Sequence, residues 1–175
     1  MDSSLLSEDI ERLKDHQVIL SLSGGKDSTA CAILLKRAGI EFTPVFMDTG
    51  WEHPLLYEYI FETLEPRFGK VTVLKSKEFP QGMPQAIRHK KIFPSRRIRY
   101  CTERLKVIPF RDYINSRSGD CVAVLGLRRE ESRKRSTVQK WDYSDQYKSD
   151  LFSPLYDWTF DQVIQLHREE DLEPC

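Results

Sequence analysis

Six consecutive residues near the start of the chain have the types and the order needed to bind phosphate. They follow an apolar run over residues 18–22, and they are Ser23, Gly24, Gly25, Lys26, Asp27 and Ser28. The run predicts a buried strand, and two adjacent glycines let the backbone turn its amides toward a ligand at close range. A helix that begins near Asp27 adds a partial positive charge, and Lys26 adds a full one. The spacing differs from that of the Walker P-loop, which has four residues between its first glycine and Gly-Lys-Ser/Thr.

Two acids near this turn are candidates for contacts with a nucleotide or a metal ion. Asp48 follows the glycines by about 20 residues and ends an apolar run over residues 42–47. An acid at this distance can accept hydrogen bonds from ribose hydroxyls or help to hold a metal, or it can simply cap the next turn. Asp27 has the same ambiguity, as a helix N-cap or as a magnesium contact. We expect Asp27 and Asp48 to bind Mg²⁺ beside the phosphates.

A dense run of cations over residues 127–135 follows the last clear apolar strand, which ends at Gly126. Guanidinium groups can bind phosphate or sulfate oxygens with two parallel hydrogen bonds. A run of charges is usually a solvated surface, but this one begins at the end of a predicted strand. We expect Arg128 to neutralise charge during catalysis, and Gly126, Arg129 and Arg133 to contact the ligand.

The four cysteines are widely spaced and contain no Cys-x-x-Cys pair, so neither a disulfide framework nor a closed zinc site is indicated. Cys101 lies among cations just before a predicted helix, and both features stabilise a thiolate. Cys101 is therefore the candidate catalytic or metal-binding cysteine, and an inert, partly buried thiol is the alternative. Cys31 and Cys121 are expected in the core, and Cys175 lies at the end of the chain.

Strands and helices alternate around these residues in a way that predicts an α/β fold. Apolar runs predict strands over residues 18–22, 42–47, 71–74 and 120–126. Helical spacing predicts helices over residues 5–13, 27–38, 54–68, 85–91 and 103–116, and from Asp157 or Thr159 onward. Residues 136–157 show no period and are expected to form a surface loop.

We expect one nucleotide-binding domain over residues 1–175, with three layers. Its centre is an open, mostly parallel sheet of about five strands, and helices cover both faces. Pro109 falls inside a predicted helix and is expected to kink or restart it. Ligands of open parallel sheets bind beyond the carboxyl ends of the strands, so the turns after the first, second and fourth predicted strands should meet at one crevice.

Charge is distributed unevenly along the chain, although the formal net charge is zero. Residues 86–140 contain sixteen basic and five acidic residues, and the segments on either side are acidic. The basic segment predicts an anion site or a nucleic-acid surface. No apolar run approaches the roughly 18 to 20 residues of a membrane span, and the start of the chain has no signal-peptide pattern. We therefore expect a cytoplasmic protein without membrane contact.

Four strings in order along residues 18–166 resemble the phosphoadenosine phosphosulfate (PAPS) reductase family of the adenine nucleotide α-hydrolase superfamily. The matching strings are residues 23–28 for the PP-loop, 47–51 for the second-strand motif, 101–106 for a cysteine-to-lysine motif and 126–132 for an arginine motif. Residues 154–158 also resemble the C-terminal segment of the family. The resemblance implies an ATP pyrophosphatase that splits ATP between the α- and β-phosphates with Mg²⁺. It implies that Gly24, Gly25, Lys26 and Ser28 hold the β- and γ-phosphates.

The resemblance leaves the chemistry open among three functions. Sulfonucleotide reductases of the family generally lack the loop lysine and use a C-terminal Glu-Cys-Gly-type nucleophile, whereas this chain has Lys26 and ends in Glu173, Pro174 and Cys175. ATP cleavage with adenylation, in sulfur metabolism or nucleic-acid modification, is therefore the first expectation. The second is reduction of PAPS, with Cys101 or Cys175 as nucleophile. The third is a non-catalytic nucleotide-binding subunit.

The expected ligands and partners follow from these three functions. The ligand is ATP or PAPS, and the acceptor is a sulfur-containing or sulfate-type compound. The basic segment over residues 86–140 is a candidate contact for nucleic acid or a protein, and a homodimer or a partner subunit is left open. An iron–sulfur cluster is not supported by the spacing of the cysteines.

Overall fold

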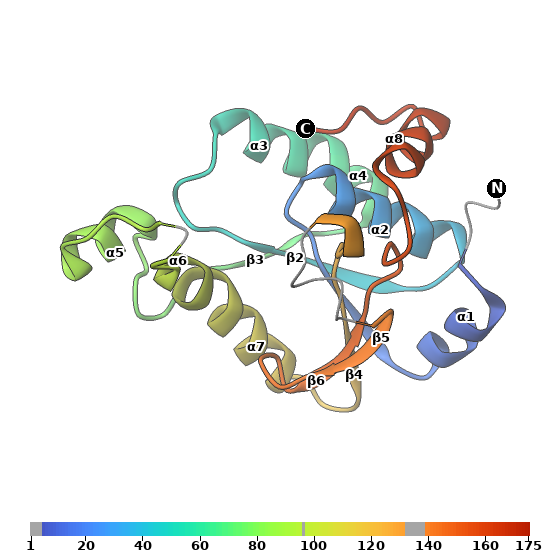
Figure 1. Ribbon diagram of the computed structural model, residues 1–175, viewed down its shortest axis with the longest axis horizontal. Helices are drawn as coiled ribbons and strands as arrows, with labels where there is room; N and C mark the ends of the chain where they lie inside the picture. The colour runs from blue at the N-terminus through green and yellow to red at the C-terminus, as the bar shows by residue number, and fades with distance from the viewer. Residues whose placement is uncertain (1–4, 96, 132–138) are drawn as a thin grey trace.

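The computed structural model describes residues 5–95, 97–131 and 139–175, which form one six-stranded sheet with helices on both faces (Figure 1). The strands are β1 Gln17–Ser21, β2 Phe42–Met47, β3 Thr72–Leu74, β4 Cys121–Val124, β5 Trp141–Ser144 and β6 Ser149–Phe152. Their order is β3-β2-β1-β4-β6-β5, and every neighbouring pair is parallel except β5 with β6. The predicted α/β fold with an open, mostly parallel sheet is confirmed.

The central strands are buried on both faces because successive side chains of a strand point to opposite sides of the sheet. Val18 and Leu20 of β1 pack in the larger core cluster, and Ile19 between them packs in the cluster on the other face. β4 repeats the pattern, with Ala123 on the side of Ile19. A strand covered on both faces is a continuous apolar run in sequence, which is why β1, β2 and β4 were predictable.

The helices are α1 Ser7–Lys14, α2 Lys26–Arg37, α3 Pro54–Glu58, α4 Glu65–Phe68, α5 Met83–Lys90, α6 Tyr100–Thr102, α7 Ile108–Asn115 and α8 Phe160–Glu169. Figure 1 shows α2, α8 and the α3–α4 helix on one face of the sheet and α7 on the other. α8 begins with a capping box in which Thr159 is the N-cap, one of its two predicted positions. Within the described ranges, no helix combines the length and the apolar character needed to cross a bilayer.

Two helices contain a π-helical segment just before a proline. η1 Tyr59–Leu64 joins α3 to α4 ahead of Pro66, and η2 Glu103–Val107 joins α6 to α7 ahead of Pro109. Proline has no amide hydrogen, so the carbonyl four residues earlier loses its α-helical partner and the turn widens. Pro109 therefore marks a change of hydrogen-bond register within a continuous helix, as a form of the predicted restart.

The sheet has six strands where about five were predicted, because the segment 136–157 contains a hairpin in place of the expected surface loop. β5 forms one edge of the sheet, and β6 runs parallel to β4. Trp141 stacks on Phe152 across the hairpin, with ring centroids 4.3 Å apart. Each strand has only four residues and includes an aspartate, Asp142 or Asp150, so neither produces an apolar run or a clear alternation.

Candidate functional site

The loop over residues 22–28 comprises the connection after β1 and the first turn of α2, and the side chain of Ser28 holds it in shape. The Ser28 hydroxyl donates to the Gly25 carbonyl at 2.9 Å and accepts from the Ser23 amide at 3.1 Å. α2 begins at Lys26 with Gly25 as its N-cap, so the suggestion that Asp27 is the N-cap is wrong. The first amides of a helix have no acceptor within that helix, and they can bind an anion.

Three glycines of this site differ in the space that surrounds them, which the position of an added Cβ shows. Gly24 has a φ of 77°, and a Cβ there would lie 2.6 Å from Cδ1 of Leu56. A Cβ at Gly126 would lie 2.8 Å from the carbonyl carbon of Asp27, so glycine lets the exit of β4 pack on the first turn of α2. The nearest described atom to a Cβ at Gly25 is a serine oxygen at 3.5 Å. Packing within the protein therefore explains Gly24 and Gly126, and leaves room at Gly25 for a ligand.

Asp27 lies between two cations, one from its own loop and one from the exit of β4. The Lys26 ammonium donates to Oδ2 at 2.5 Å, and Arg128 Nε donates to Oδ1 at 2.8 Å. The Arg128 side chain is 5% exposed and also pairs with Glu130, whereas the Lys26 side chain is 27% exposed. Lys26 can reach a ligand, while Arg128 in this arrangement acts on the loop through Asp27.

Asp48 follows β2 and has hydrogen-bond or ion-pair partners on both carboxylate oxygens. The Tyr57 hydroxyl and the Gly50 amide donate to Oδ1 at 2.7 and 2.8 Å, and the Lys75 ammonium lies 3.2 Å from Oδ2. Burial alone raises the pKa of Asp48, but these three donors outweigh burial and bring the pKa below its ordinary value of 3.8. Burial, followed by the hydrogen bond to Asp48, raises the pKa of Tyr57 above its usual range. At neutral pH, Asp48 is therefore a carboxylate and Tyr57 a neutral donor.

Gly82, which no sequence pattern pointed to, fixes the turn that carries Asp48. Its φ is 72°, and a Cβ there would lie 2.0 Å from the carbonyl oxygen of Thr49. The Met83 amide donates to that same oxygen at 2.7 Å. The start of α5 therefore rests on the exit of β2. The contact between Gly82 and Thr49 is tertiary, so the sequence around Gly82 carries no local signal of it.

His167 is the second residue that the sequence did not reveal, and it links α8 to the loop. Its side chain is 1% exposed. Nε2 lies 2.8 Å from the Lys26 carbonyl oxygen, and Nδ1 lies 2.8 Å from the Leu172 carbonyl oxygen. The Tyr59 hydroxyl donates to the Glu173 carbonyl at 2.8 Å and holds the same C-terminal segment. The only local signal was a histidine on the apolar face of the last predicted helix.

For the remaining predicted site residues, the structure shows no contact with the loop among the residues that it describes. Arg129 is exposed and pairs with Asp157 at 3.2 Å. Arg133 and the other cations at positions 134 and 135 lie outside the described residues. Cys101 packs beside a separate small cluster with Phe79, Ala86 and Leu105 at its centre.

The other three cysteines differ in their burial. Cys31 is fully buried in α2, and burial, followed by the charge of Asp27, raises the pKa of its thiol above the usual range. Cys121 is half-buried at the start of β4, and burial raises the pKa of its thiol as well. Cys175 is exposed. The prediction that these two cysteines lie in the core is therefore correct for Cys31 and partly correct for Cys121.

The carboxylates expected to bind Mg²⁺ do not form a ready-made metal site. Asp27 and Asp48 each have partners on both oxygens, and one of these partners is a lysine in each case. Among the residues that the structure describes, no three His, Cys, Asp or Glu side chains are grouped so that they could share a metal. Magnesium binding by Asp27 or Asp48 stays a prediction that needs at least one lysine to move.

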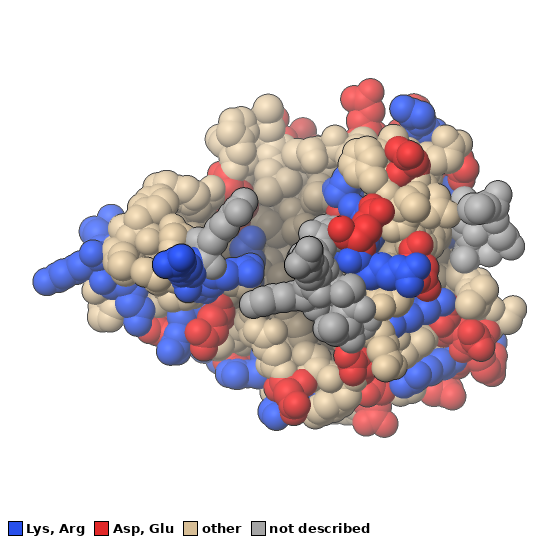
Figure 2. All heavy atoms as spheres, in the orientation of Figure 1, with Lys and Arg blue, Asp and Glu red and all other residues tan. Residues whose placement is uncertain are grey.

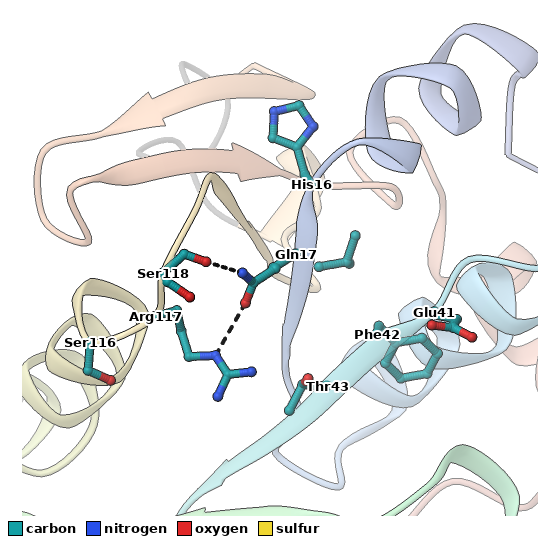
Figure 3. A pocket seen from close by; sticks show the side chains of 9 residues that line it. His16, Gln17, Glu41, Phe42, Thr43, Ser116, Arg117 and Ser118 are labelled. Carbon is teal, nitrogen blue, oxygen red and sulfur yellow. Dashed lines mark hydrogen bonds between the residues drawn. The ribbon is translucent and has the colours of Figure 1, made fainter.

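A cavity of about 630 Å³ lies at the opposite edge of the sheet, at the amino ends of β1 and β2 (Figure 3). His16, Gln17, Glu41 and Arg117 are among its lining residues. The Gln17 side chain joins the start of β1 to the turn after α7. It accepts a hydrogen bond from Arg117 Nε at 3.3 Å and donates one to the Ser118 carbonyl. Ligands of open parallel sheets bind at the carboxyl edge, so this cavity is separate from the candidate site.

The comparisons with known proteins concern nearly the whole chain. A family model described as the phosphoadenosine phosphosulfate reductase domain matches residues 17–175. An uncharacterized 37.8 kDa protein of Escherichia phage 186 is 27% identical over 205 residues, which cover 89% of this chain and 61% of that protein. The chain therefore spans less than two thirds of the length of this relative.

Two solved structures have the same fold. PAPS reductase from Candida auris, in a phosphate complex, superposes with a TM-score of 0.65 at 14% identity, covering 97% of this chain and 89% of that chain. NH3-dependent NAD synthetase from Campylobacter jejuni superposes with a TM-score of 0.63 at 16% identity, covering 95% and 69%. These likenesses show the fold, which is that of the adenine nucleotide α-hydrolases. With the family match over residues 17–175, the chain belongs to the phosphoadenosine phosphosulfate reductase domain family.

Proposed function

We propose that this protein binds ATP at the loop over residues 22–28 and cleaves it at the α-phosphate, which releases pyrophosphate and adenylates an acceptor. The observation that carries the proposal is the loop itself. Lys26 stands at the first position of α2 with a partly exposed ammonium, next to a glycine that packing leaves unobstructed. Membership of the family and the position at the carboxyl edge of a parallel sheet support nucleotide binding here.

Each part of the loop has its own role in the proposed reaction. Gly25 and the first amides of α2 hold the β- and γ-phosphates, and Lys26 turns from Asp27 to the pyrophosphate leaving group. Asp27 keeps Arg128 as a partner at 2.8 Å, so its partly buried carboxylate is not left unpaired when Lys26 turns away. Lys26 and the first amides of α2 then stabilise the charge that develops during the transfer.

Asp48 has a separate role, which is to receive the ribose. Its carboxylate is held by Tyr57 and Gly50 at the exit of the strand next to β1. The acceptor is proposed to be a sulfate-type or sulfur-containing compound, or a nucleic acid that is modified through its adenylated form.

Pyrophosphate release tests the proposal. We expect ATP to bind in the absence of an acceptor, and pyrophosphate to appear when the right member of a panel of sulfur-containing and nucleic-acid acceptors is added. Lys26→Ala should abolish release, while Lys36→Ala, at the far end of the same helix and exposed, should not. No release with any acceptor, together with thiol-dependent reduction of PAPS, would overturn the proposal.

Reduction of a sulfonucleotide is a second candidate, because the C-terminal segment is tied to the loop. His167 contacts the carbonyls of Lys26 and Leu172, and Cys175 follows a few residues later with an exposed side chain. A Cys175 thiolate would attack the sulfur of PAPS, form a cysteine S-sulfonate and release the nucleotide. Mass spectrometry after incubation with PAPS separates the two candidates: an S-sulfonate that Cys175→Ser abolishes supports reduction.

A further inference from the structure

Residues 83–106 extend from the carboxyl edge of the sheet and carry a large excess of positive charge. We call this segment, from α5 through α6 to Lys106, the basic arm. Figure 2 shows lysine and arginine side chains gathered at the end of the molecule that carries α5 and α6, beside a hollow in the surface. Glu103 is the single acidic residue of the segment. The described basic residues of the arm are Arg88, Lys90, Lys91, Arg97, Arg99, Arg104 and Lys106.

Most of these cations have no carboxylate partner among the described residues. Arg104 pairs with Glu78 at 3.3 Å. Among the described residues, no carboxylate lies within 4.0 Å of the charged groups of Lys90, Lys91, Arg97, Arg99 and Lys106. On the body of the protein, by contrast, Arg37 pairs with two glutamates and Lys140 with Asp9. The arm therefore concentrates cations without carboxylate partners in one short segment that has a single acidic residue.

Apolar side chains are exposed among these cations. Ile92, Phe93 and Ile98 are three of the nine large apolar side chains that the described residues expose, and Phe93 is 63% exposed. Trp51, 57% exposed, lies in the turn after β2 on which the arm begins. Single-stranded nucleic acids bind to this combination, because cations neutralise the phosphates while an exposed aromatic ring stacks on a base.

The arm packs against the segment before it through a small core. Ala86 and Leu105 of the arm are buried together with Phe79. The Tyr100 hydroxyl donates to the Ile92 carbonyl at 2.7 Å and closes the connection that carries the exposed phenylalanine. A surface that is already ordered loses little conformational entropy when a ligand binds.

We propose that the basic arm binds a single-stranded nucleic acid, with its unpaired cations on successive phosphates and Phe93 stacked on a base. The arm starts at Gly82 and Met83, against the turn that carries Asp48, so a bound strand would lie beside the carboxyl edge of the sheet. Both DNA and RNA offer the phosphates and bases that this surface needs. Binding to the arm requires no nucleotide turnover, so its test is independent of the proposed function.

Fluorescence anisotropy with labelled single strands of about 15 nucleotides, as DNA and as RNA of one sequence, tests the proposal. The arm variant combines Lys90→Gln, Arg97→Gln and Arg99→Gln. Its affinity at about 0.1 M salt should fall at least about tenfold, and the slope of log affinity against log salt should fall by about 2, since each phosphate contact contributes about 0.7. Phe93→Ala should weaken binding about fivefold or more without changing that slope.

The matched control combines Lys14→Gln, Lys70→Gln and Arg168→Gln, three exposed cations outside the arm. It makes the same change in net charge and should bind like the wild type. Equal losses of affinity in the two triple variants, or no binding by the wild type at low salt, would overturn the proposal. Either result would favour a protein as the partner of the arm. Tighter binding to a labelled DNA duplex of the same sequence than to either single strand would overturn it as well. ATP affinity, measured on the same samples, reports separately on the proposed function.

Discussion

The Lys26 side chain can be removed without leaving its partner Asp27 unpaired. Its ammonium contacts Asp27, which keeps Arg128 on the other oxygen at 2.8 Å. Lys26→Ala is therefore expected to change the free energy of unfolding by about 1 kcal/mol or less, because partly exposed ion pairs contribute little. Pyrophosphate release should fall at least about 100-fold, the usual loss when a group that stabilises transition-state charge is removed. Urea denaturation and a coupled pyrophosphate assay measure the two effects, and unchanged release would remove the loop from the mechanism.

His167 has a different role from Lys26, since its side chain is buried and holds two segments together. Its two ring nitrogens contact the carbonyl oxygens of Lys26 and Leu172, so one side chain joins the start of α2 to the segment after α8. His167→Ala should lower the free energy of unfolding by about 2 to 4 kcal/mol, because it leaves a cavity and removes the ring that contacts both carbonyl oxygens. Hydrogen exchange should rise in the first turn of α2 and after α8. Gln165→Ala, exposed on the same helix, is the control, and equal exchange in both variants would contradict this role.

Substitutions at different glycines should distinguish packing within the protein from binding of the phosphates. Gly126→Ala should lower the free energy of unfolding by about 1 to 3 kcal/mol, because its Cβ would press on the backbone of α2. Gly25→Ala meets nothing closer than 3.5 Å, so it should leave stability nearly unchanged and weaken ATP binding. Gly39→Ala is the control for strain alone, since its φ is 67° and its Cβ would meet no atom within 4 Å. Thermal unfolding and ATP titration distinguish the three, and normal ATP affinity in Gly25→Ala would contradict the assigned approach of the phosphates.

The succession of β1, α2, β2 and β4 could be predicted because each element is a long apolar run or a helical period with clear ends. β5 and β6 could not, because they are short and pair through tertiary contacts, such as the stacking of Trp141 on Phe152. At the site, the sequence indicated Lys26, Asp27 and Gly126 together, and the structure brings them into contact. It could not indicate that Gly82 contacts Thr49 or that His167 contacts Lys26, because those partners lie far away in the chain and contribute carbonyl oxygens, which any residue supplies.

Across the whole molecule, Asp48 connects the exits of two neighbouring strands and makes stability depend on pH. Tyr57 and Lys75 hold it from elements on either side, and its side chain is only 10% exposed. Since its pKa in the folded state lies below the ordinary 3.8, the unfolded chain binds its proton first as the pH falls. The stabilisation is therefore complete well above pH 3.8 and is lost as the pH falls through the lower, folded value.

Asp48→Asn should consequently lower the free energy of unfolding more at pH 7 than at pH 3, because the wild type loses the same charged contacts on acidification. Urea denaturation at a series of pH values between these limits measures the difference, and the acid slope of the variant should be shallower. Asp145→Asn is the matched control, since that carboxylate is 91% exposed and pairs only with Lys148 among the described residues. A variant at Asp48 with the acid slope of the wild type would show that Tyr57, Gly50 and Lys75 do not favour the charged carboxylate in the folded protein.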